Sequence, residues 1–406
     1  MSISVRRRLF ASLMPAPLLA LAIASHALSP AKVKKPVEPT ILKTSDGTVE
    51  TGYLDDAPYR IDIPNNWNHS LVVFYHGYAE QPYLYRITDH INSQALPLFE
   101  RGYAVIESGY SQTGWALEQA YPETEDLRRY FIKRYGQPRE TYAAGGSMGG
   151  QLVAITLELN PRPYVGGLDL CGSVGASYQN FNRRFADRAA FDVYFPGVLP
   201  PLDPVPTGFE DTAADRSRVL AALRTNPAAA TLLRNLTGLH SDVDLAHNMS
   251  YWTFITEDLQ RRGGGNPFDN RNLIYSGTDP ASSASDLDLN QRVHRYAADP
   301  RAQAYLVHHY TPTGNLGRPM LAIHTIYDPI VQLSQLPPYQ RHVQAAGAGR
   351  NFVQQYVDRE GHCNFTEDQI GDAFDELVHW THGGPPPTPG LLKIKKPEEP
   401  AETNRK

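Results

Sequence analysis

The hydrophobic pattern of the chain alternates between short apolar runs and segments with apolar residues on one helical face. Runs rich in β-branched and aromatic residues predict buried strands at 70–77, 103–111, 141–147, 164–172, 319–328 and 351–358. Segments 122–136 and 149–159 predict helices, and a closing helix follows the capping-box pair Thr366 and Gln369. This alternation predicts an α/β fold with a mostly parallel sheet and helices on both faces.

A long interruption separates the first four of these runs from the last two. Residues 175–315 contain proline-rich and glycine-rich stretches, helix-like segments and few strand signals. We interpret them as an inserted, largely helical cap. The expected organisation is a signal peptide (1–27), a flexible lead-in (28–44), a first core part (45–174), the cap (175–315), a second core part (316–382) and a disordered tail (383–406).

The N-terminus has the pattern of an export signal. Three arginines at 6–8 precede an apolar run at 9–24, and residues 25–27 offer a small-x-small cleavage site. A membrane anchor is the alternative, but the run is short and contains two prolines. We therefore expect a secreted or periplasmic protein that keeps no stable membrane anchor once the signal is removed.

Composition narrows the class of protein further. The 406 residues are 41% hydrophobic and 20% charged, which suits a globular chain with a substantial core. The formal net charge of −5 provides no basic field for nucleic acid, so no nucleic-acid partner is expected. The two cysteines do not form a zinc-type pattern, and no metal is expected.

The most informative stretch is "GGSMGG" at 145–150. It fits the G-x-S-x-G pattern between a predicted strand and a predicted helix. A turn this tight holds Ser147 in strained geometry, and glycines beside it remove Cβ atoms that would collide. The hydroxyl then projects from the sheet edge, where the dipole of the next helix favours negative charge. Ser147 is therefore the predicted nucleophile.

A serine nucleophile needs a base and an orienting acid, which follow it along the chain in this type of fold. Asp328 lies just past a predicted strand, and His362 lies in a glycine loop between the last strand and the last helix. We predict a Ser147–Asp328–His362 triad. Asp169 is the chief rival acid, although it lies within a strand pattern rather than beyond its end.

The reaction also needs donors for the oxyanion that forms during acyl transfer. The backbone N–H of Met148, directly after the nucleophile, is the first predicted donor. The second is expected from the loop that begins "HGY", where the N–H of Tyr78 follows His76 and Gly77.

Taken together, "FYHGY", "GGSMGG", "YDPIV" and "EGHCNF" occur in an order that resembles the α/β-hydrolase superfamily. The resemblance covers about residues 45–175 and 315–382. It implies a mostly parallel eight-stranded sheet, a Ser-Asp-His triad and no cofactor.

Cys363 directly follows His362. In this position of a cysteine the chain resembles the secreted tannase and feruloyl esterase group. In that group a disulfide joins residues beside the nucleophile and the histidine. Here Gly146, not a cysteine, precedes Ser147, and the second cysteine is Cys171. A Cys171–Cys363 disulfide is one expectation, and two buried free thiols are the other.

The leading hypothesis is an exported serine esterase that acts on a small-molecule or polymeric ester through an acyl-enzyme. A capped serine peptidase with the same triad is the first alternative, with cap acids such as Glu210, Asp211, Glu257 and Asp258 as candidates to anchor a substrate amine. A non-catalytic binding protein on the same scaffold is the second. Aromatic residues of the cap either line an apolar pocket or form the cap's own core: Tyr178, Phe181, Phe185, Phe191, Tyr194, Phe195, Tyr251 and Trp252. Trp115, outside the cap, has the same two interpretations.

Overall fold

The computed structural model describes residues 38–392. The expected signal peptide, residues 28–37 of the expected lead-in and residues 393–406 of the expected tail lie outside the described residues. The strands are β1 (Thr40–Lys43), β2 (Gly47–Leu54), β3 (Ala57–Pro64), β4 (Leu71–Tyr75), β5 (Ala104–Ser108), β6 (Thr141–Gly146), β7 (Gly166–Leu170), β8 (Met320–Tyr327), β9 (Phe352–Glu360) and β10 (Gly390–Leu391). The helices are α1 (Leu96–Glu100), α2 (Leu117–Tyr135), α3 (Met148–Leu159), α4 (Ser177–Tyr194), α5 (Ala213–Thr225), α6 (Pro227–Thr237), α7 (Asp242–Gly263), α8 (Ala284–Arg292), α9 (Pro300–His308), α10 (Leu336–Ala345) and α11 (Glu367–Thr381), with short 3₁₀ turns η1 (Leu333–Gln335) and η2 (Gly349–Asn351).

The strands of the described chain form one mixed sheet in the order β1-β2-β3-β5-β4-β6-β7-β8-β9-β10. From β5 to β10 every neighbouring pair is parallel, whereas β1, β2 and β3 pair in antiparallel fashion. This sheet confirms the mostly parallel arrangement, but the expected number of eight strands is wrong.

The two additional strands lie at the sheet edges, within segments expected to be flexible. In the lead-in, Thr40–Lys43 pairs with β2, and in the tail, Gly390–Leu391 pairs with β9. The four residues of β1 are all exposed. Backbone hydrogen bonds to β2, rather than burial of side chains, hold β1 in the sheet. Its sequence therefore shows no alternation of hydrophobic and polar residues.

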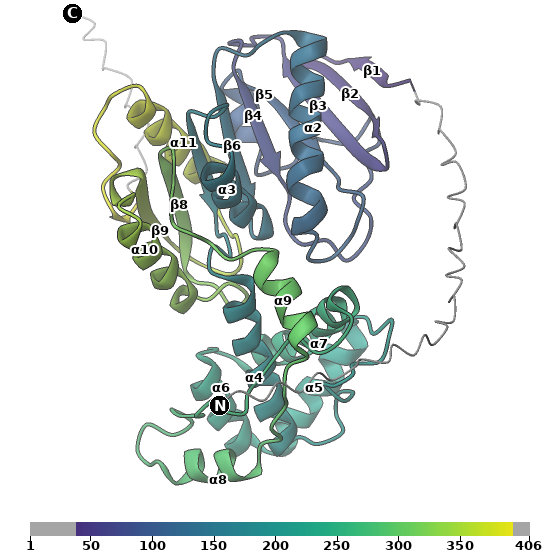
Figure 1. The fold of residues 1–406 in the computed structure, drawn as a ribbon, viewed down its shortest axis with the longest axis vertical. Helices are drawn as coiled ribbons and strands as arrows, with labels where there is room; N and C mark the ends of the chain where they lie inside the picture. Colours follow the sequence, from purple (N-terminus) through teal and green to yellow (C-terminus); the bar gives the residue numbers. More distant parts are fainter. Residues whose placement is uncertain (1–37, 393–406) are drawn as a thin grey trace, which may run out of the picture. The chain divides into compact units, whose positions relative to one another are not determined.

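Side chains of the central strands alternate between two cores. On β4, Leu71, Val73 and Tyr75 belong to the core that also contains residues of α2 and α3, while Val72 and Phe74 belong to the core under α11. Figure 1 shows α2 and α3 on the near face of the sheet and α11 behind it. The fully apolar strand runs therefore reflect burial on both faces.

The sequence predicted bounds for two helices and the start of a third, and these agree with α3 (Met148–Leu159) and α11 but only in part with α2. Thr366 and Gln369 form the expected capping box at the start of α11. The exception is α2, which begins at Leu117 and carries Pro122 inside it rather than at its start. The extension is fixed by a long-range contact, since the Trp115 amide next to the helix start donates to Asp258 of α7 at 2.8 Å.

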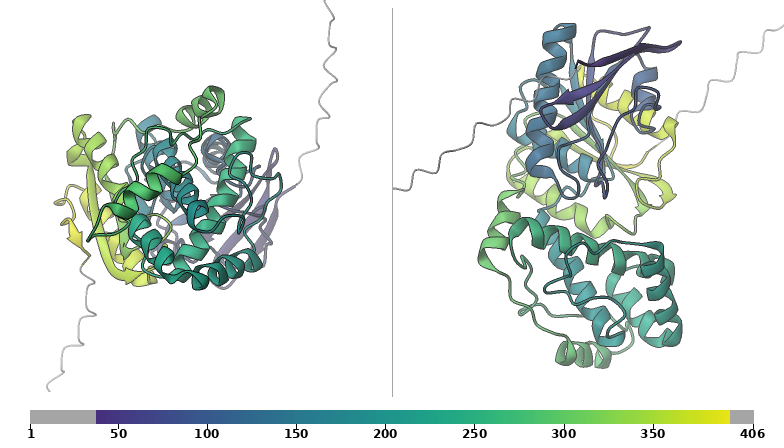
Figure 2. Two further views of the ribbon diagram at one scale, coloured as in Figure 1. Left: turned by 90° about the horizontal axis from the view of Figure 1, so that it is seen from below. Right: turned by 90° about the vertical axis from the view of Figure 1, so that its right-hand side faces the viewer.

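Between β7 and β8 the described chain forms α4 to α9 and contains no strand. Figure 2 shows these helices gathered into one all-helical group. Its side chains contact the carboxyl end of the sheet: Arg184 donates to Gln332 (2.9 Å), and Asp244 accepts from the hydroxyl of Tyr327, at the end of β8 (2.9 Å). Within the described residues, no helix is both long enough and apolar enough to cross a bilayer.

Candidate active site

Ser147 lies at the turn that joins β6 to α3. Its backbone has φ +58° and ψ −119°, a conformation that is uncommon for a residue with a side chain. The glycines around it allow close backbone approach: a Cβ on Gly149 would lie 2.0 Å from the Tyr75 oxygen, and one on Gly145 would lie 2.7 Å from the same oxygen. The local sequence therefore produces the strained elbow that exposes a nucleophile.

Three side chains from distant parts of the chain meet at this elbow. His362 Nε2 lies 2.9 Å from Ser147 Oγ, and His362 Nδ1 lies 2.7 Å from Asp328 Oδ2. In the tautomer with the proton on Nδ1, His362 donates to Asp328 and accepts from the Ser147 hydroxyl. This is the geometry that a serine nucleophile, a general base and an orienting carboxylate require.

The second oxygen of Asp328 fixes the loop around it. Asp328 Oδ1 accepts from the backbone amides of Ile330 (2.8 Å) and Val331 (2.9 Å), and the residue is 1% exposed. Burial by itself would raise the pKa of Asp328, but His362, His324 and the Ile330 amide outweigh it and hold the pKa below its usual value. Asp328 is therefore ionised at neutral pH and can stabilise a protonated His362.

The rival acid Asp169 is not brought to His362. Its Oδ1 accepts from the Gly172 amide at 2.8 Å and lies against Gly150 beneath the elbow. Burial, only partly offset by the Gly172 amide, raises the pKa of Asp169 to about 7. Asp169 is thus a buried group that supports the elbow, because within residues 38–392 it forms no hydrogen bond with His362 or Ser147.

His324 lies on β8, four residues before Asp328, and was not predicted to be part of the site. Its Nε2 donates to the Val331 oxygen at 2.8 Å and lies 3.5 Å from Asp328 Oδ2. Burial lowers its pKa, so the ring is neutral. It braces the loop that holds Asp328. The signal available in the sequence was its position four residues before an acid at a strand end.

The two predicted oxyanion donors lie on the segments that flank the nucleophile. Met148 is the first residue of α3, so its N–H has no intrahelical acceptor. A Cβ on Gly77, next to Tyr78, would lie 3.3 Å from Ser147 Cβ, which places this loop directly beside the nucleophile. Their role as donors stays a prediction.

His76 stabilises that loop from behind. Its ring stacks on Tyr110 and Tyr83, with centroids 3.9 and 4.3 Å away, and its Nδ1 lies 2.7 Å from the Gly77 oxygen. Burial, opposed by contacts with the Gly77 and Gly109 backbones, lowers the pKa of His76 to about 4. The neutral ring thus fixes the turn that presents Tyr78.

Cys171 and Cys363 form a disulfide, with their Cα atoms 5.4 Å apart. The bridge ties the residue after His362 to the end of β7, beside the elbow. Of the described His, Cys, Asp and Glu side chains, only Cys171, His362 and Cys363 lie close enough together to hold a metal ion. Because the two sulfurs are bonded to each other, this group is not a metal site.

Removing this bridge should destabilise the protein. It closes a loop of 192 residues, and restricting an unfolded loop of that length is worth about 3 kcal/mol or more. We expect the double variant Cys171→Ala/Cys363→Ala to have a free energy of unfolding that is lower by that amount. Its urea midpoint should therefore lie at a lower concentration than that of the wild type. An unchanged midpoint would mean that the bridge does not constrain the unfolded chain.

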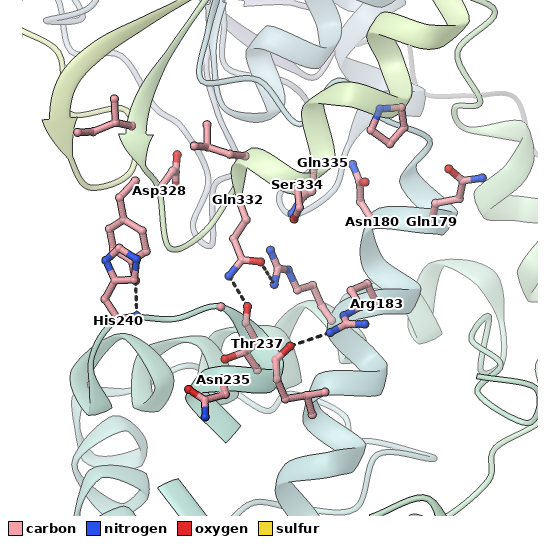
Figure 3. Close-up of a pocket in the computed structure, with 17 residues that line it drawn as sticks. Gln179, Asn180, Arg183, Asn235, Thr237, His240, Asp328, Gln332, Ser334 and Gln335 are labelled. Atoms are coloured by element: carbon pink, nitrogen blue, oxygen red, sulfur yellow. Dashed lines mark hydrogen bonds between the residues drawn. The ribbon is translucent and has the colours of Figure 1, made fainter. Parts of the chain in front are cut away.

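Two cavities adjoin the triad. The first, of about 20 Å³, contains Ser147 and is walled by aromatic and apolar side chains: Tyr78, Trp115, Phe181, Tyr251, Trp252, Ile255, Ile330 and Val331. Three of the cap aromatics therefore line it, as does Trp115, whereas Phe185, Phe191 and Phe195 are buried in the core. The second cavity, of about 670 Å³, is lined by Asp328 and by residues of α4, α6 and η1 (Figure 3).

The sequence matches no protein-family model, and no curated protein matches it. Solved structures similar to this chain include Candida antarctica lipase A (13% identity, 89% of this chain and 85% of that one, TM-score 0.46). Feruloyl esterase B from Aspergillus oryzae is similar at 11% identity (84% and 82%, TM-score 0.44). Puromycin hydrolase is similar at 14% identity (89% and 43%, TM-score 0.41), so the chain spans less than half of that protein's length.

The fold is recognised from features of this chain. Its mostly parallel sheet, the strained serine turn between β6 and α3, and the chain order Ser147, Asp328, His362 occur together. These features together characterise the α/β-hydrolase fold. The described chain has the α/β-hydrolase fold.

Proposed function

We propose that this protein is a serine hydrolase that cleaves carboxylic esters through an acyl-enzyme intermediate. The observation that carries the proposal is the hydrogen-bonded chain from Ser147 through His362 to the buried Asp328. An esterase needs this set of groups and no further cofactor chemistry.

The reaction proceeds in two halves. Ser147 Oγ attacks the ester carbonyl while His362 Nε2 takes its proton, and Asp328 stabilises the resulting imidazolium. The amides of Met148 and Tyr78 hold the oxyanion, each worth about 3 kcal/mol in the transition state. His362 then gives its proton to the departing alcohol, and water activated by the same ring releases the acid.

The small cavity around Ser147 favours a short acyl group. The acyl group stays bonded to Ser147 Oγ in the intermediate, so it must occupy the cavity that Ser147 lines. A volume of about 20 Å³ between aromatic side chains holds little more than one water-sized group, which excludes a long acyl chain from this space. We therefore propose that acetyl esters are cleaved faster than hexanoyl esters.

Shortening a wall residue should relax this preference. Phe181 packs edge-on against Trp115, with centroids 4.6 Å apart, and Phe181→Leu opens the cavity. We expect the ratio of kcat/KM for p-nitrophenyl hexanoate over acetate to rise about tenfold. Phe195→Leu, at the end of the same helix and equally buried, is the matched control and should leave the ratio unchanged. Equal ratios in both variants would refute the assignment of the acyl cavity.

A serine peptidase is the second candidate, favoured by one specific observation. A separate cavity of about 230 Å³ contains Glu80, Glu210, Asp211, Glu257 and Asp258 and shares Tyr78 with the cavity at Ser147. Three of these acids are already paired, however: Asp211 with Arg216 at 2.6 Å, Asp258 with Arg261 and Arg262 at 2.6 and 2.9 Å, and Glu257 with Arg261 at 3.8 Å. This pairing weakens the case for an amine-binding site.

One comparison separates the two functions. Hydrolysis of p-nitrophenyl acetate is measured beside that of amino-acyl p-nitroanilides with free amines, using purified protein. We expect the ester to be cleaved with a far higher kcat/KM. Faster cleavage of the anilides, with loss of that activity in Glu257→Gln, would replace the esterase proposal with the peptidase one.

A further inference from the structure

The cavity of about 670 Å³ beside Asp328 has an unusual lining. Its size is typical of sites for small organic ligands. Five carboxamide side chains contribute to its wall, together with Thr237 and Ser334 (Figure 3): Gln179, Asn180, Asn235, Gln332 and Gln335. We call it the amide cavity.

The amide cavity is connected to the nucleophile through shared residues. Asn180 and Gln335 line both the amide cavity and the small cavity that contains Ser147. Asn180 Nδ2 donates to Ser173 Oγ at 3.0 Å, and Ser173 Oγ donates to Gln335 Oε1 at 3.5 Å. A polar bridge therefore separates the two spaces, and hydroxyl groups of a ligand can replace its hydrogen bonds.

Much of the hydrogen-bonding capacity of these amides is unused. Within residues 38–392 the Gln179 carboxamide makes no hydrogen bond, and the Asn235 side chain makes one, from Nδ2 to the Thr278 oxygen at 2.9 Å. Gln332 is the exception, because both ends of its carboxamide are bonded. It accepts from Arg184 and donates to the Thr237 oxygen at 2.8 Å, and so links α4 to α6 (Figure 3).

The two arginines in the wall already have protein partners, and they share one carboxylate, that of Asp187. Arg183 Nη2 donates to the Leu236 oxygen at 2.8 Å, and its Nε lies 3.1 Å from Asp187. Arg184 is buried, donates to Gln332 and lies over the Trp252 ring. The groups left to face a ligand are thus neutral amides, which both donate and accept. Hydroxyl groups do the same, so the lining is complementary to a neutral polyol rather than to an anion.

We propose that the amide cavity binds the alcohol portion of the substrate, and that this portion is a hydroxyl-rich group such as a sugar. The proposal rests on the proposed esterase function. Since the acyl group must remain in the small cavity on Ser147, the alcohol occupies the larger space. Hydrolysis then releases a short carboxylic acid and a sugar hydroxyl, which takes its proton from His362.

The test compares three acetate esters: methyl 6-O-acetyl-glucoside, hexyl acetate, and the acetate of 6-hydroxyhexanoate, which carries a carboxylate. We expect kcat/KM for the glucoside ester to exceed that for hexyl acetate at least tenfold. Gln335→Ala and Gln179→Ala should each lower this ratio about tenfold, as lost hydrogen bonds to the sugar predict. Gln137→Ala, an exposed amide after α2, is the control and should change neither rate.

Each contrary result has its own meaning. A preference for hexyl acetate, or equal losses on both esters in the variants, would overturn the sugar assignment and leave the esterase intact. A preference for the carboxylate ester that disappears in Arg183→Ala would make the cavity an anion site. If no ester is hydrolysed and fluorophosphonate does not label the protein, the proposed function fails. Calorimetry with Ser147→Ala reads binding directly: saturable binding of the glucoside ester, weakened by Gln335→Ala, supports the proposal, and no binding overturns it.

Discussion

Ser147→Ala should abolish ester hydrolysis, with kcat reduced about 10⁶-fold relative to the wild type. The hydroxyl is the atom that forms the acyl-enzyme, and no other hydroxyl lies within hydrogen-bonding distance of His362 in the described chain. Labelling by a fluorophosphonate should be lost in parallel. Both losses are measured on purified protein with p-nitrophenyl acetate and with the labelled probe.

The fold should survive this change. Among residues 38–392, Ser147 Oγ bonds only His362, and the tight turn is set by the glycines and by the Ser147 amide, which donates to the Leu170 oxygen at 2.9 Å. The far-UV spectrum and the thermal midpoint of Ser147→Ala should therefore match those of the wild type. A folded variant that keeps its turnover would show that another group is the nucleophile.

Asp328→Asn should lower kcat about 10⁴-fold while Asp169→Asn keeps most of the activity. An amide at 328 presents an N–H to His362 Nδ1, which forces the ring proton to Nε2 and leaves no acceptor for the Ser147 proton. At position 169 an amide oxygen still accepts from the Gly172 amide, so the elbow is preserved. The kcat of each variant is measured under conditions in which both variants are folded to the same extent.

Asp169→Asn should also change how the folding stability of the protein depends on pH. The pKa of Asp169 is raised to about 7 in the folded protein by burial, whereas an aspartate in an unfolded chain ionises near 4. Ionisation therefore costs folded stability progressively as the pH rises from about 4 through 7. Asp169→Asn lacks this cost and should be more stable than the wild type above pH 7, as urea unfolding at pH 5 and pH 8 measures.

A larger loss of kcat in Asp169→Asn than in Asp328→Asn would reverse the assignment of the acid.

The central contacts could be predicted because parallel strands place their carboxyl ends at one edge of a sheet. Ser147, Asp328 and His362 each follow a strand that the apolar runs identify, so sequence order alone brings them to a common edge. The capping box at Thr366 could be predicted equally well, because it depends only on two residues that are three positions apart.

The features that escaped prediction depend on long-range packing. The edge strands β1 and β10 exist because neighbouring strands offer free backbone groups. The amide cavity forms where α4 and α6 meet η1, and no local pattern relates Gln179 to Gln335 across that distance in sequence. His324 contacts Asp328 only because the chain turns back through Val331.

The most direct test of the account is to locate the covalent adduct that the wild-type protein forms. Protein treated with a fluorophosphonate is digested and sequenced by mass spectrometry, with hydrolysis of p-nitrophenyl acetate followed in the same sample. We predict one adduct, on Ser147, whose formation parallels the loss of activity. An adduct on a different residue, or full inactivation with Ser147 unmodified, would contradict the claim that Ser147, His362 and Asp328 act together as the catalytic group.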